Sequence, residues 1–361
     1  MFPLEITTEA VARVDKSDML GTIYAFPGQV ERALRATQVP SFNYQGQFDK
    51  VLLTGLGGSA IGADYLTHWA ATESRFPLVV NRDYQIPKWV DARTLVVTIS
   101  MSGGTEETLA AFGEARARGA KIVAVSTGGK MKEFCQKTNT PFIEVEGGMQ
   151  PRAAVGRMLV ADALALEAAG VLQTRAALEK AVTTLKAMQQ EYDPKGPANR
   201  NPAKQLALQL GDTIPVVYAS GHLVPVARRF ANQLNENSKI LAFWGAMPEM
   251  NHNELVGWSG DAQPNRFTAV LLRSDLEHPG NAKRFEYTAN LMREWGANVV
   301  EIKARGTTVA EQLLTTTYHA DLVSGYLAVL RGQDPTPVQP ISGLKEALGK
   351  LGIVEKAERS L

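Results

Sequence analysis

The sequence has little of what marks secreted, membrane-bound or nucleic-acid-binding proteins. Among 361 residues there is one cysteine, so no disulfide can form within the chain. Lys and Arg number 38 against 37 Asp and Glu, a balance without bulk attraction to nucleic acid or anionic membranes. No run approaches the roughly 18 apolar residues of a membrane span, and the N-terminus lacks the pattern of a signal peptide. We therefore expect a cytoplasmic protein that binds neither nucleic acid nor a membrane.

Residues for metal or redox chemistry are also scarce. Cys135 lies in KEFCQK with no histidine nearby in sequence, which favours a semi-buried helix residue over a nucleophile. His252 and Glu254 are conceivable metal ligands, but the helical H-E-x-x-H spacing and any Cys/His cluster are missing. The sequence therefore predicts no metal site and no cofactor. The remaining histidines are isolated and receive no role: His68, His222, His278 and His319.

What the sequence does contain is a repeated alternation of short apolar strands and helices. In the first half we expect strands at 51–54, 77–80, 94–100, 121–126 and 141–145, with helices at 60–71 and 106–118. Long helices at 151–171 and 176–192 lead to the linker YDPKGPANRNP. After it we expect strands at 214–219, 240–244, 267–273 and 298–302, with helices at 224–235, 283–294 and 309–330.

This order predicts an α/β fold with two doubly wound domains, each a parallel sheet flanked by helices. Runs such as TLVVTIS and KIVAVS are typical of parallel strands buried on both faces. The two halves look like a duplication of one α/β unit. The predicted segments are an N-terminal helical arm at 1–46, a first domain at 47–170, a helical connection and linker at 171–200, a second domain at 201–331, and a C-terminal tail at 332–361 that ends in a short helix.

Two loops in the first half indicate a phosphate site. GLGGSAIG at 55–62 and SMSGGT at 100–105 each follow a strand and begin a helix. Ligands of open parallel sheets bind at that edge, and helix N-termini present free N–H groups to anions. Four side chains add hydroxyl groups: Ser59, Ser100, Ser102 and Thr105. Without a lysine or a Walker pattern, the phosphate would be held rather than transferred.

Two other interpretations of these loops stay open. They can be tight strand-to-helix turns with Ser/Thr capping. Alternatively, Gly55-x-Gly57-x-x-Ala60 fits a permissive dinucleotide fingerprint. That fingerprint needs an acidic residue at the end of the second strand, where this sequence has Arg82, which suits a 2′-phosphate instead.

Aldose–ketose isomerisation needs a base that moves a proton between C1 and C2, help with ring opening, and a cation near the developing oxyanion. Glu236 lies between two asparagines, and His252 lies in a polar loop. Arg152 begins a helix after the first sheet, and Lys345 lies in the tail. Each also has an ordinary interpretation as a solvated helix end, a loop hydrogen-bonding group or a surface cation.

Six motifs in order across nearly the whole chain resemble the bifunctional phosphoglucose/phosphomannose isomerases. This branch of the phosphoglucose isomerase superfamily is built from two sugar-isomerase (SIS) domains. The motifs are GLGGSAIG at 55–62, SMSGGTEET at 100–108, PRAAVG at 151–156, NEN at 235–237, MPEMNHNEL at 247–255, and DPTPV with ISGLK within 334–345.

The resemblance implies a sugar phosphate substrate. The reaction would interconvert glucose 6-phosphate and fructose 6-phosphate, with mannose 6-phosphate as a second substrate. The phosphate would be held by the Gly57 and Gly58 backbone with Ser59, Ser100, Ser102 and Thr105. It implies that Glu236 shuttles the proton, that His252 and Lys345 serve ring opening, and that Arg152 stabilises the enediolate. It also implies a homodimer in which the histidine reaches into the neighbouring subunit.

One position departs from the family pattern. Family members usually carry Asn after the first glycine of the second phosphate loop, whereas this sequence has Gly104. Two alternative functions stay open within the superfamily. A sugar-phosphate-binding regulator would need the phosphate loops without the catalytic set, but no DNA-binding segment is visible. A ketose–amino sugar enzyme would need an amine-handling site, which the sequence does not show.

Overall fold

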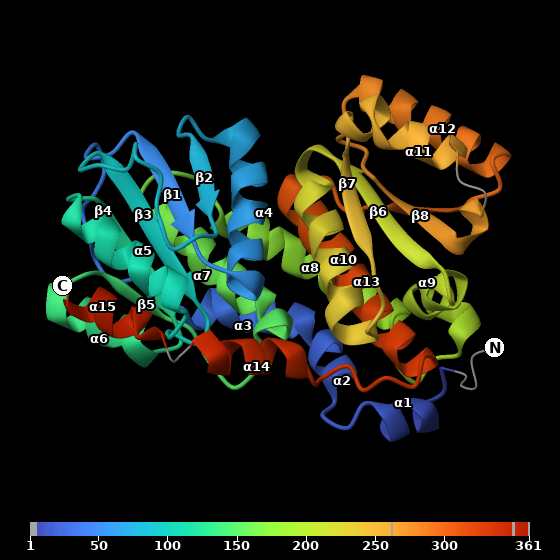
Figure 1. Cartoon of the computed structure of the whole chain (residues 1–361), viewed down its shortest axis with the longest axis horizontal. Coiled ribbons are helices and arrows are strands. Elements are labelled where there is room, and N and C mark those ends of the chain that lie inside the picture. Colours follow the sequence, from blue (N-terminus) through green and yellow to red (C-terminus); the bar gives the residue numbers. More distant parts are fainter. Residues whose placement is uncertain (1–5, 261–262, 349–350, 360–361) are drawn as a thin grey trace. The chain divides into compact units, whose positions relative to one another are not determined.

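The computed structural model describes residues 6–260, 263–348 and 351–359 (Figure 1). The chain forms two compact units, each assembled from separate stretches of sequence. Unit 1 consists of Met1–Pro27 and Lys180–Pro337, and unit 2 of Gly28–Glu179 and Val338–Leu361. Residues of the expected N-terminal arm thus occur in both units. The five-segment division remains a prediction from sequence pattern.

Unit 2 is built on a five-stranded sheet in which every pairing is parallel. The strand order is β2-β1-β3-β4-β5. The chain reverses direction across the sheet between β1 and β3, which is where doubly wound proteins bind ligands. The strands are β1 (Lys50–Thr54), β2 (Leu78–Asn81), β3 (Thr94–Ser100), β4 (Lys121–Ser126) and β5 (Phe142–Glu144).

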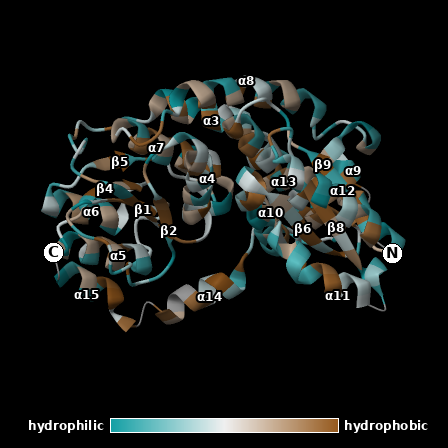
Figure 2. Cartoon of the chain, turned by 90° about the horizontal axis from the view of Figure 1, so that it is seen from above, coloured by the Kyte–Doolittle hydropathy of each residue, from teal (hydrophilic) through white to brown (hydrophobic). Residues whose placement is uncertain are grey.

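Helices pack on this sheet from two groups. α4 packs against α7 and both contact strands, while α5, α6 and α15 share an apolar cluster with β1, β3 and β4 that includes Phe112, Phe134 and Ala357. Every residue of β3 is buried, as expected for a strand covered on both faces. Figure 2 shows the strands of unit 2 in brown along much of their length. The helices are α3 (Phe26–Ala36, which begins in unit 1), α4 (Gly57–Glu73), α5 (Glu106–Ala117), α6 (Gly129–Thr138), α7 (Val155–Ala168), α14 (Gln339–Leu348) and α15 (Ile353–Arg359), with α8 (Arg175–Glu191) continuing into unit 1.

Unit 1 repeats the arrangement with a parallel sheet of four strands in the order β7-β6-β8-β9. This is the order of the first four strands of unit 2, as a duplicated α/β unit predicts. The expectation of two doubly wound α/β domains, each with a parallel sheet flanked by helices, is confirmed. The strands are β6 (Ile214–Ser220), β7 (Phe243–Met247), β8 (Phe267–Arg273) and β9 (Asn298–Lys303).

The long helix α13 (Val309–Leu330) forms the centre of unit 1 and is buried along nearly its whole length. It contacts α9 (Pro202–Leu210), α10 (Val224–Ser238) and the N-terminal helices α1 (Thr8–Val14) and α2 (Met19–Tyr24). Its start has a capping box between Thr308 and Glu311. A separate apolar cluster joins the sheet to α11 (Glu254–Gly260) and α12 (Pro279–Glu294).

Several elements differ from the sequence-based expectation. The single helical arm is interrupted because the Asp15 carboxylate accepts hydrogen bonds from the Met19 and Leu20 amides and starts a new helix. The strand expected at 240–244 begins at Phe243, because Asn235 Nδ2 holds the carbonyl of Ala242 at 3.0 Å. Helices α9 and α11 were not among the expected elements, and the tail forms two helices instead of one. The expected helical setting of Cys135 is confirmed, because that residue lies in α6, whose bounds were not predicted. No helix in the described ranges is long and apolar enough to cross a membrane.

Candidate phosphate-binding loops and acid–base residues

The loop after β1 in unit 2 leads directly into α4. Gly57 begins that helix with a left-handed φ of 53°, and a Cβ built on it would meet nothing within 4 Å. The N-cap residue Leu56 makes no side-chain hydrogen bond to the helix start. This N-terminus therefore offers its N–H groups and positive dipole end toward open space, as anion-binding helices do.

The loop after β3 presents hydroxyl groups at the start of α5. The hydroxyls of Ser100 and Thr105 are hydrogen-bonded at 2.9 Å, and Ser102 Oγ accepts from the Gly104 amide at 3.3 Å. Ser100 is buried whereas Ser102 is exposed. A Cβ on Gly104 would meet nothing within 4 Å, so the departure from asparagine is not imposed by crowding.

A direct hydrogen bond ties the two loops together. Ser59 is 5% exposed, and its Oγ accepts a hydrogen bond from the Met101 amide at 3.0 Å. Because the oxygen is the acceptor, the hydroxyl hydrogen can still be donated to another group. The structure thus brings Gly57, Ser59 and the second loop to one edge of the sheet, where β1 and β3 end.

A third loop, after β4, supports this arrangement and was missed in the sequence. Thr127 Oγ1 donates to the Met101 carbonyl at 2.7 Å, and the Met131 amide donates to the Gly103 carbonyl at 2.8 Å. A Cβ on Gly103 would lie only 1.9 Å from the Gly128 carbonyl oxygen. The signal was the glycine pair that follows strand KIVAVS, which repeats the strand–glycine–helix pattern of the other two loops.

Arg152 lies behind the first loop. It belongs to a short 3-10 helix, Pro151–Ala153, and is 5% exposed. A Cβ on Gly58 would lie 2.8 Å from the Pro151 carbonyl oxygen and 3.3 Å from the Arg152 amide. Only glycine at position 58 allows this approach, so the loop and the arginine are positioned by one contact.

Arg82, which suits a 2′-phosphate in the dinucleotide interpretation, is engaged within the fold. Its guanidinium forms a short ion pair with Asp64 and donates to the Ala60 carbonyl at 3.4 Å, both on α4. Beside it, the Tyr84 hydroxyl donates to Glu106 at 2.6 Å, and this hydrogen bond raises the pKa of the tyrosine. Through these contacts, Arg82 holds the first turns of α4 in place.

Glu236 lies in unit 1, near the end of α10, and is half-buried. Its neighbours anchor the helix end. The Asn237 amide donates to Ser324 Oγ at 2.9 Å, and Ser238 Oγ donates to the Ser324 carbonyl at 2.6 Å. Further along α10, Arg229 forms a buried bidentate ion pair with Asp321 of α13 at 3.0 and 2.7 Å. The carboxylate is therefore carried by a firmly held helix.

The remaining predicted residues divide between the units. His252 is exposed at the end of a 3-10 helix, Glu249–His252, in unit 1. Lys345 belongs to α14 in unit 2, and its side chain lies outside the described part of the structure. Within the described ranges, no group of three or more His, Cys, Asp or Glu residues could hold a metal ion. Cys135 is buried on α6, and burial raises its thiol pKa to about 12, so it is held as an unreactive thiol.

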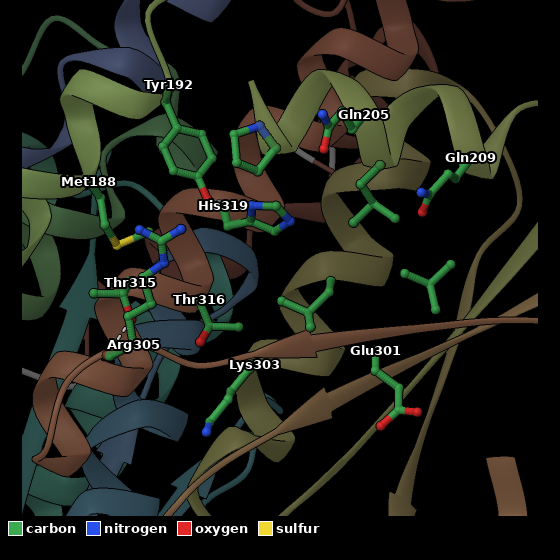
Figure 3. Close-up of a pocket in the computed structure, with 14 residues that line it drawn as sticks. Met188, Tyr192, Gln205, Gln209, Glu301, Lys303, Arg305, Thr315, Thr316 and His319 are labelled. Atoms are coloured by element: carbon green, nitrogen blue, oxygen red, sulfur yellow. Dashed lines mark hydrogen bonds between the residues drawn. The ribbon is translucent and has the colours of Figure 1, made fainter. Parts of the chain in front are cut away.

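A cavity of about 220 Å³ in unit 1 contains none of the predicted site residues (Figure 3). It lies among α8, α9, β9 and α13, and its polar walls include the His319 imidazole and Arg305. The Tyr192 hydroxyl is hydrogen-bonded to His319 Nδ1 at 2.8 Å. Burial lowers the pKa of His319 to about 4, so the ring is neutral at pH 7. Arg305 is held in a bidentate ion pair with Glu191.

Comparison with known proteins identifies both halves of the chain. The SIS domain family model matches residues 47–141, and the model of the bacterial phospho-glucose isomerase C-terminal SIS domain matches residues 199–348. The bifunctional phosphoglucose/phosphomannose isomerase of Caldicellulosiruptor bescii is 37% identical over 92% of this chain and 99% of that protein. That of Aquifex aeolicus is 35% identical over 83% of this chain and 90% of its own length.

Solved structures share the fold at low sequence identity. The C-terminal domain of glucosamine-fructose-6-phosphate aminotransferase from Francisella tularensis has a TM-score of 0.68 at 17% identity, covering 88% of this chain and 97% of that one. Glucosamine-6-phosphate deaminase from Thermotoga maritima has a TM-score of 0.66 at 15% identity, covering 88% and 96%. At these identities the likeness concerns the fold alone.

Proposed function

This chain belongs to the family of bifunctional phosphoglucose/phosphomannose isomerases, and we propose that it interconverts glucose 6-phosphate and mannose 6-phosphate with fructose 6-phosphate. The observation that carries the proposal is the pair of loops after β1 and β3, joined by the Ser59–Met101 hydrogen bond of 3.0 Å. Such a pair suits a phosphate monoester that is bound without being transferred. The proposal locates the reaction in the cytoplasm.

The phosphate would be held by backbone and hydroxyl groups of unit 2. The starts of α4 and α5 have no side-chain cap, so each can accept an external anion. Ser59, Ser102 and Thr105 would add hydroxyl donors, and Ser100 would orient Thr105 through their 2.9 Å hydrogen bond. Backbone at Gly57 and Gly58 completes the set. This arrangement fixes one end of the substrate.

The chemistry would proceed through a cis-enediol. After ring opening, the Glu236 carboxylate would remove the proton from C2 of the aldose, and the C1 carbonyl would become an enediolate oxygen. Glu236 would then return the proton to C1 while the O2 hydroxyl proton moves to O1, which leaves a C1 hydroxyl and a C2 carbonyl, so that atoms and charge balance. Arg152 would stabilise the enediolate charge. His252 and Lys345 would serve ring opening by delivering a proton to the ring oxygen and accepting one from the C1 hydroxyl.

The test follows each sugar phosphate separately in a coupled assay with EDTA-treated protein. We expect turnover from both glucose 6-phosphate and mannose 6-phosphate to fructose 6-phosphate. Glu236→Gln should keep the fold and substrate binding but lose about 100- to 10,000-fold in kcat, the usual contribution of a general base. The matched control is Glu286→Gln, which removes an exposed carboxylate of α12 that pairs with Lys283 at 3.0 Å.

Three outcomes would change the proposal. Near-normal turnover by Glu236→Gln would show that another group is the base. Turnover of a single epimer would narrow the specificity. Binding of both sugar phosphates without turnover by the unmodified protein would favour the sugar-phosphate-binding regulator.

We also propose that the protein is a homodimer. Strand β7 is an edge strand with β6 as its hydrogen-bonded neighbour, and large apolar residues are exposed on and just before it. The exposed fractions are 68% for Leu241, 51% for Phe243 and 41% for Trp244. Light scattering should give twice the 39.2 kDa chain mass, and Phe243→Asp should shift it toward a single chain. A monomer mass for the unmodified protein would refute the dimer.

A further inference from the structure

Lys239 ends α10 in a conformation that its side chain does not favour. Its φ is 53° and its ψ 41°, in the left-handed region. Among the described residues other than glycine, Asp18 and Asn139 also have positive φ. Aspartate and asparagine tolerate this region because their short polar side chains can form local hydrogen bonds. Lysine lacks this feature, and glycine is the residue usually found at such a helix end. A lysine at this position therefore requires another reason.

The reason lies in the contacts of its ammonium group. Lys239 Nζ donates to the Glu236 carbonyl at 2.6 Å and to the Pro335 carbonyl at 3.1 Å, with a longer contact of 3.5 Å to the Asn237 carbonyl. Two of these oxygens are terminal carbonyls of α10, which have no partner within the helix. The ammonium has three N–H donors on one nitrogen, so it can serve several carbonyls that converge on one point.

The two ends of this bridge belong to parts of the proposed catalytic set. One is the backbone of Glu236, the proposed base. The other, Pro335, lies in the segment DPTPV, which leads into α14 and Lys345. The bonds of Asn237 and Ser238 to Ser324 hold α10 to α13, but they do not reach that segment. The hydrogen bond from Lys239 Nζ to the Pro335 carbonyl joins the helix end to that segment.

We propose that Lys239 is a positioning residue that fixes the Glu236 backbone and the entry to α14 in one geometry. Its three described hydrogen bonds go to backbone carbonyls, and the proposal gives it a role through the backbone rather than on the substrate. This inference rests on the proposed isomerase function. Because the phosphate would be held by the loops of unit 2, losing Lys239 should reduce kcat and leave KM nearly unchanged. A small misplacement of a base is enough to slow proton transfer strongly.

The experiment replaces Lys239 by glycine, which favours the left-handed cap and removes only the ammonium and its stem. We expect kcat for glucose 6-phosphate to fall about 10- to 100-fold, with KM within about threefold of its original value. Trypsin should also cleave faster after Arg331, just before the released segment. The matched control is Asn139→Gly, at a C-cap of φ 52° and ψ 41° on α6, which should leave all three readouts unchanged.

A kcat within twofold of the unmodified protein would overturn the proposal, because the cap conformation alone would then suffice. Thermal unfolding would measure the fraction of folded protein. A loss of activity that only matches a loss of folded protein would also overturn the proposal. If Lys239→Gly does not fold, Lys239→Asn repeats the test with a residue that tolerates the same conformation but is too short to reach Pro335. A parallel assay of Glu236→Gln separates failure of the proposed base from failure of the proposed role of Lys239. If Glu236→Gln remains active, the proposed base is wrong. If Glu236→Gln is inactive and the Lys239 variants are active, only the role of Lys239 is wrong.

Discussion

The four strands of unit 1 repeat the order of the first four strands of unit 2, yet the loops at the carboxyl edges of the two sheets differ. In unit 2 the loops after β1 and β3 leave open space at Gly57 and Gly104. The unit 2 loops are joined directly by Ser59 and Met101, whereas in unit 1 a side chain of α13 joins the loops after β6 and β8. Gln312 Oε1 contacts both His222 Nε2 at 2.9 Å and Ser274 Oγ at 2.5 Å. The shared topology creates a crevice in each unit, and the loop residues decide whether it stays available to a ligand.

The helix starts show the same contrast. In unit 2, α4 and α5 begin without a side-chain cap. In unit 1, α13 carries its own anion, because the Glu311 carboxylate accepts from the amides of Thr307 and Thr308 at 3.0 Å each. Two helices of unit 2 thus begin without a side-chain cap, whereas unit 1 neutralises the start of its longest helix with a carboxylate of its own.

The largest expected effect comes from a matched pair of glycines. Gly57 and Gly221 follow the first strand of their units with φ of 53° and 55°, and a Cβ at either would meet nothing within 4 Å. Alanine at each should cost about 1 kcal/mol in the free energy of unfolding, because left-handed φ is unfavourable for alanine. Gly57→Ala should also raise KM about tenfold, since it changes a helix start proposed to bind phosphate.

Denaturant unfolding and steady-state kinetics on both variants provide the measurement. Gly221→Ala should keep the original KM despite an equal loss of stability. If both variants raised KM alike, the assignment of phosphate binding to unit 2 alone would be wrong.

An intermediate effect is expected at the capping box of α13. Burial opposes ionisation of Glu311, but hydrogen bonds from Thr184 and Thr308 outweigh it, and its pKa falls from 4.5 to about 2. A lowered pKa contributes stability above pH 4.5 that is lost as the pH falls toward 2. Glu311→Gln should therefore lower the free energy of unfolding by about 1–2 kcal/mol at pH 7.

The difference between Glu311→Gln and the original protein should shrink between pH 4.5 and about 2, as measured by urea unfolding at several pH values. KM should not change, because the proposed phosphate contacts all lie in unit 2 and do not include this helix start. A pH-independent difference would show that the ionised carboxylate is not the source of the stability.

The smallest effect is expected at Gly104, where the sequence departs from its family. Because a Cβ there meets nothing within 4 Å, Gly104→Asn should change the free energy of unfolding by less than about 0.5 kcal/mol. An added amide at the phosphate loop should lower the Kd for a sugar phosphate by up to about threefold. Calorimetric titration with a sugar phosphate would measure it, and weaker binding would show that the glycine is itself the preferred residue.

Much of the fold was predictable because strands buried on both faces appear as continuous apolar runs. The expected ranges of β3 and β4 agree with the structure. Strand β7 was misplaced because its outward residues Phe243 and Trp244 are exposed, and Gly245 interrupts the pattern. A helix was expected at Cys135, but the start of α6 was not predicted, because its two glycines resemble a loop.

The candidate site was predictable only in part. The two phosphate loops could be recognised from local sequence, because strand, glycine and hydroxyl residues are adjacent there. The hydrogen bond that joins the two loops could not be predicted, since Ser59 and Met101 are separated by 42 residues. The setting of Glu236 depends on α13, where Asn237 bonds to Ser324 across 87 residues. The catalytic assignments themselves came from the family resemblance and stay predictions.

The C-terminal helix α15 packs against α5, and Ala357 completes the apolar cluster of unit 2. During synthesis on a ribosome, the sheet of unit 2 emerges long before this helix does. Its cluster therefore has to wait until all of unit 1 has been translated, since Lys180–Pro337 lies between. A chain that lacks this helix would leave the part of the apolar cluster that Ala357 covers exposed to water.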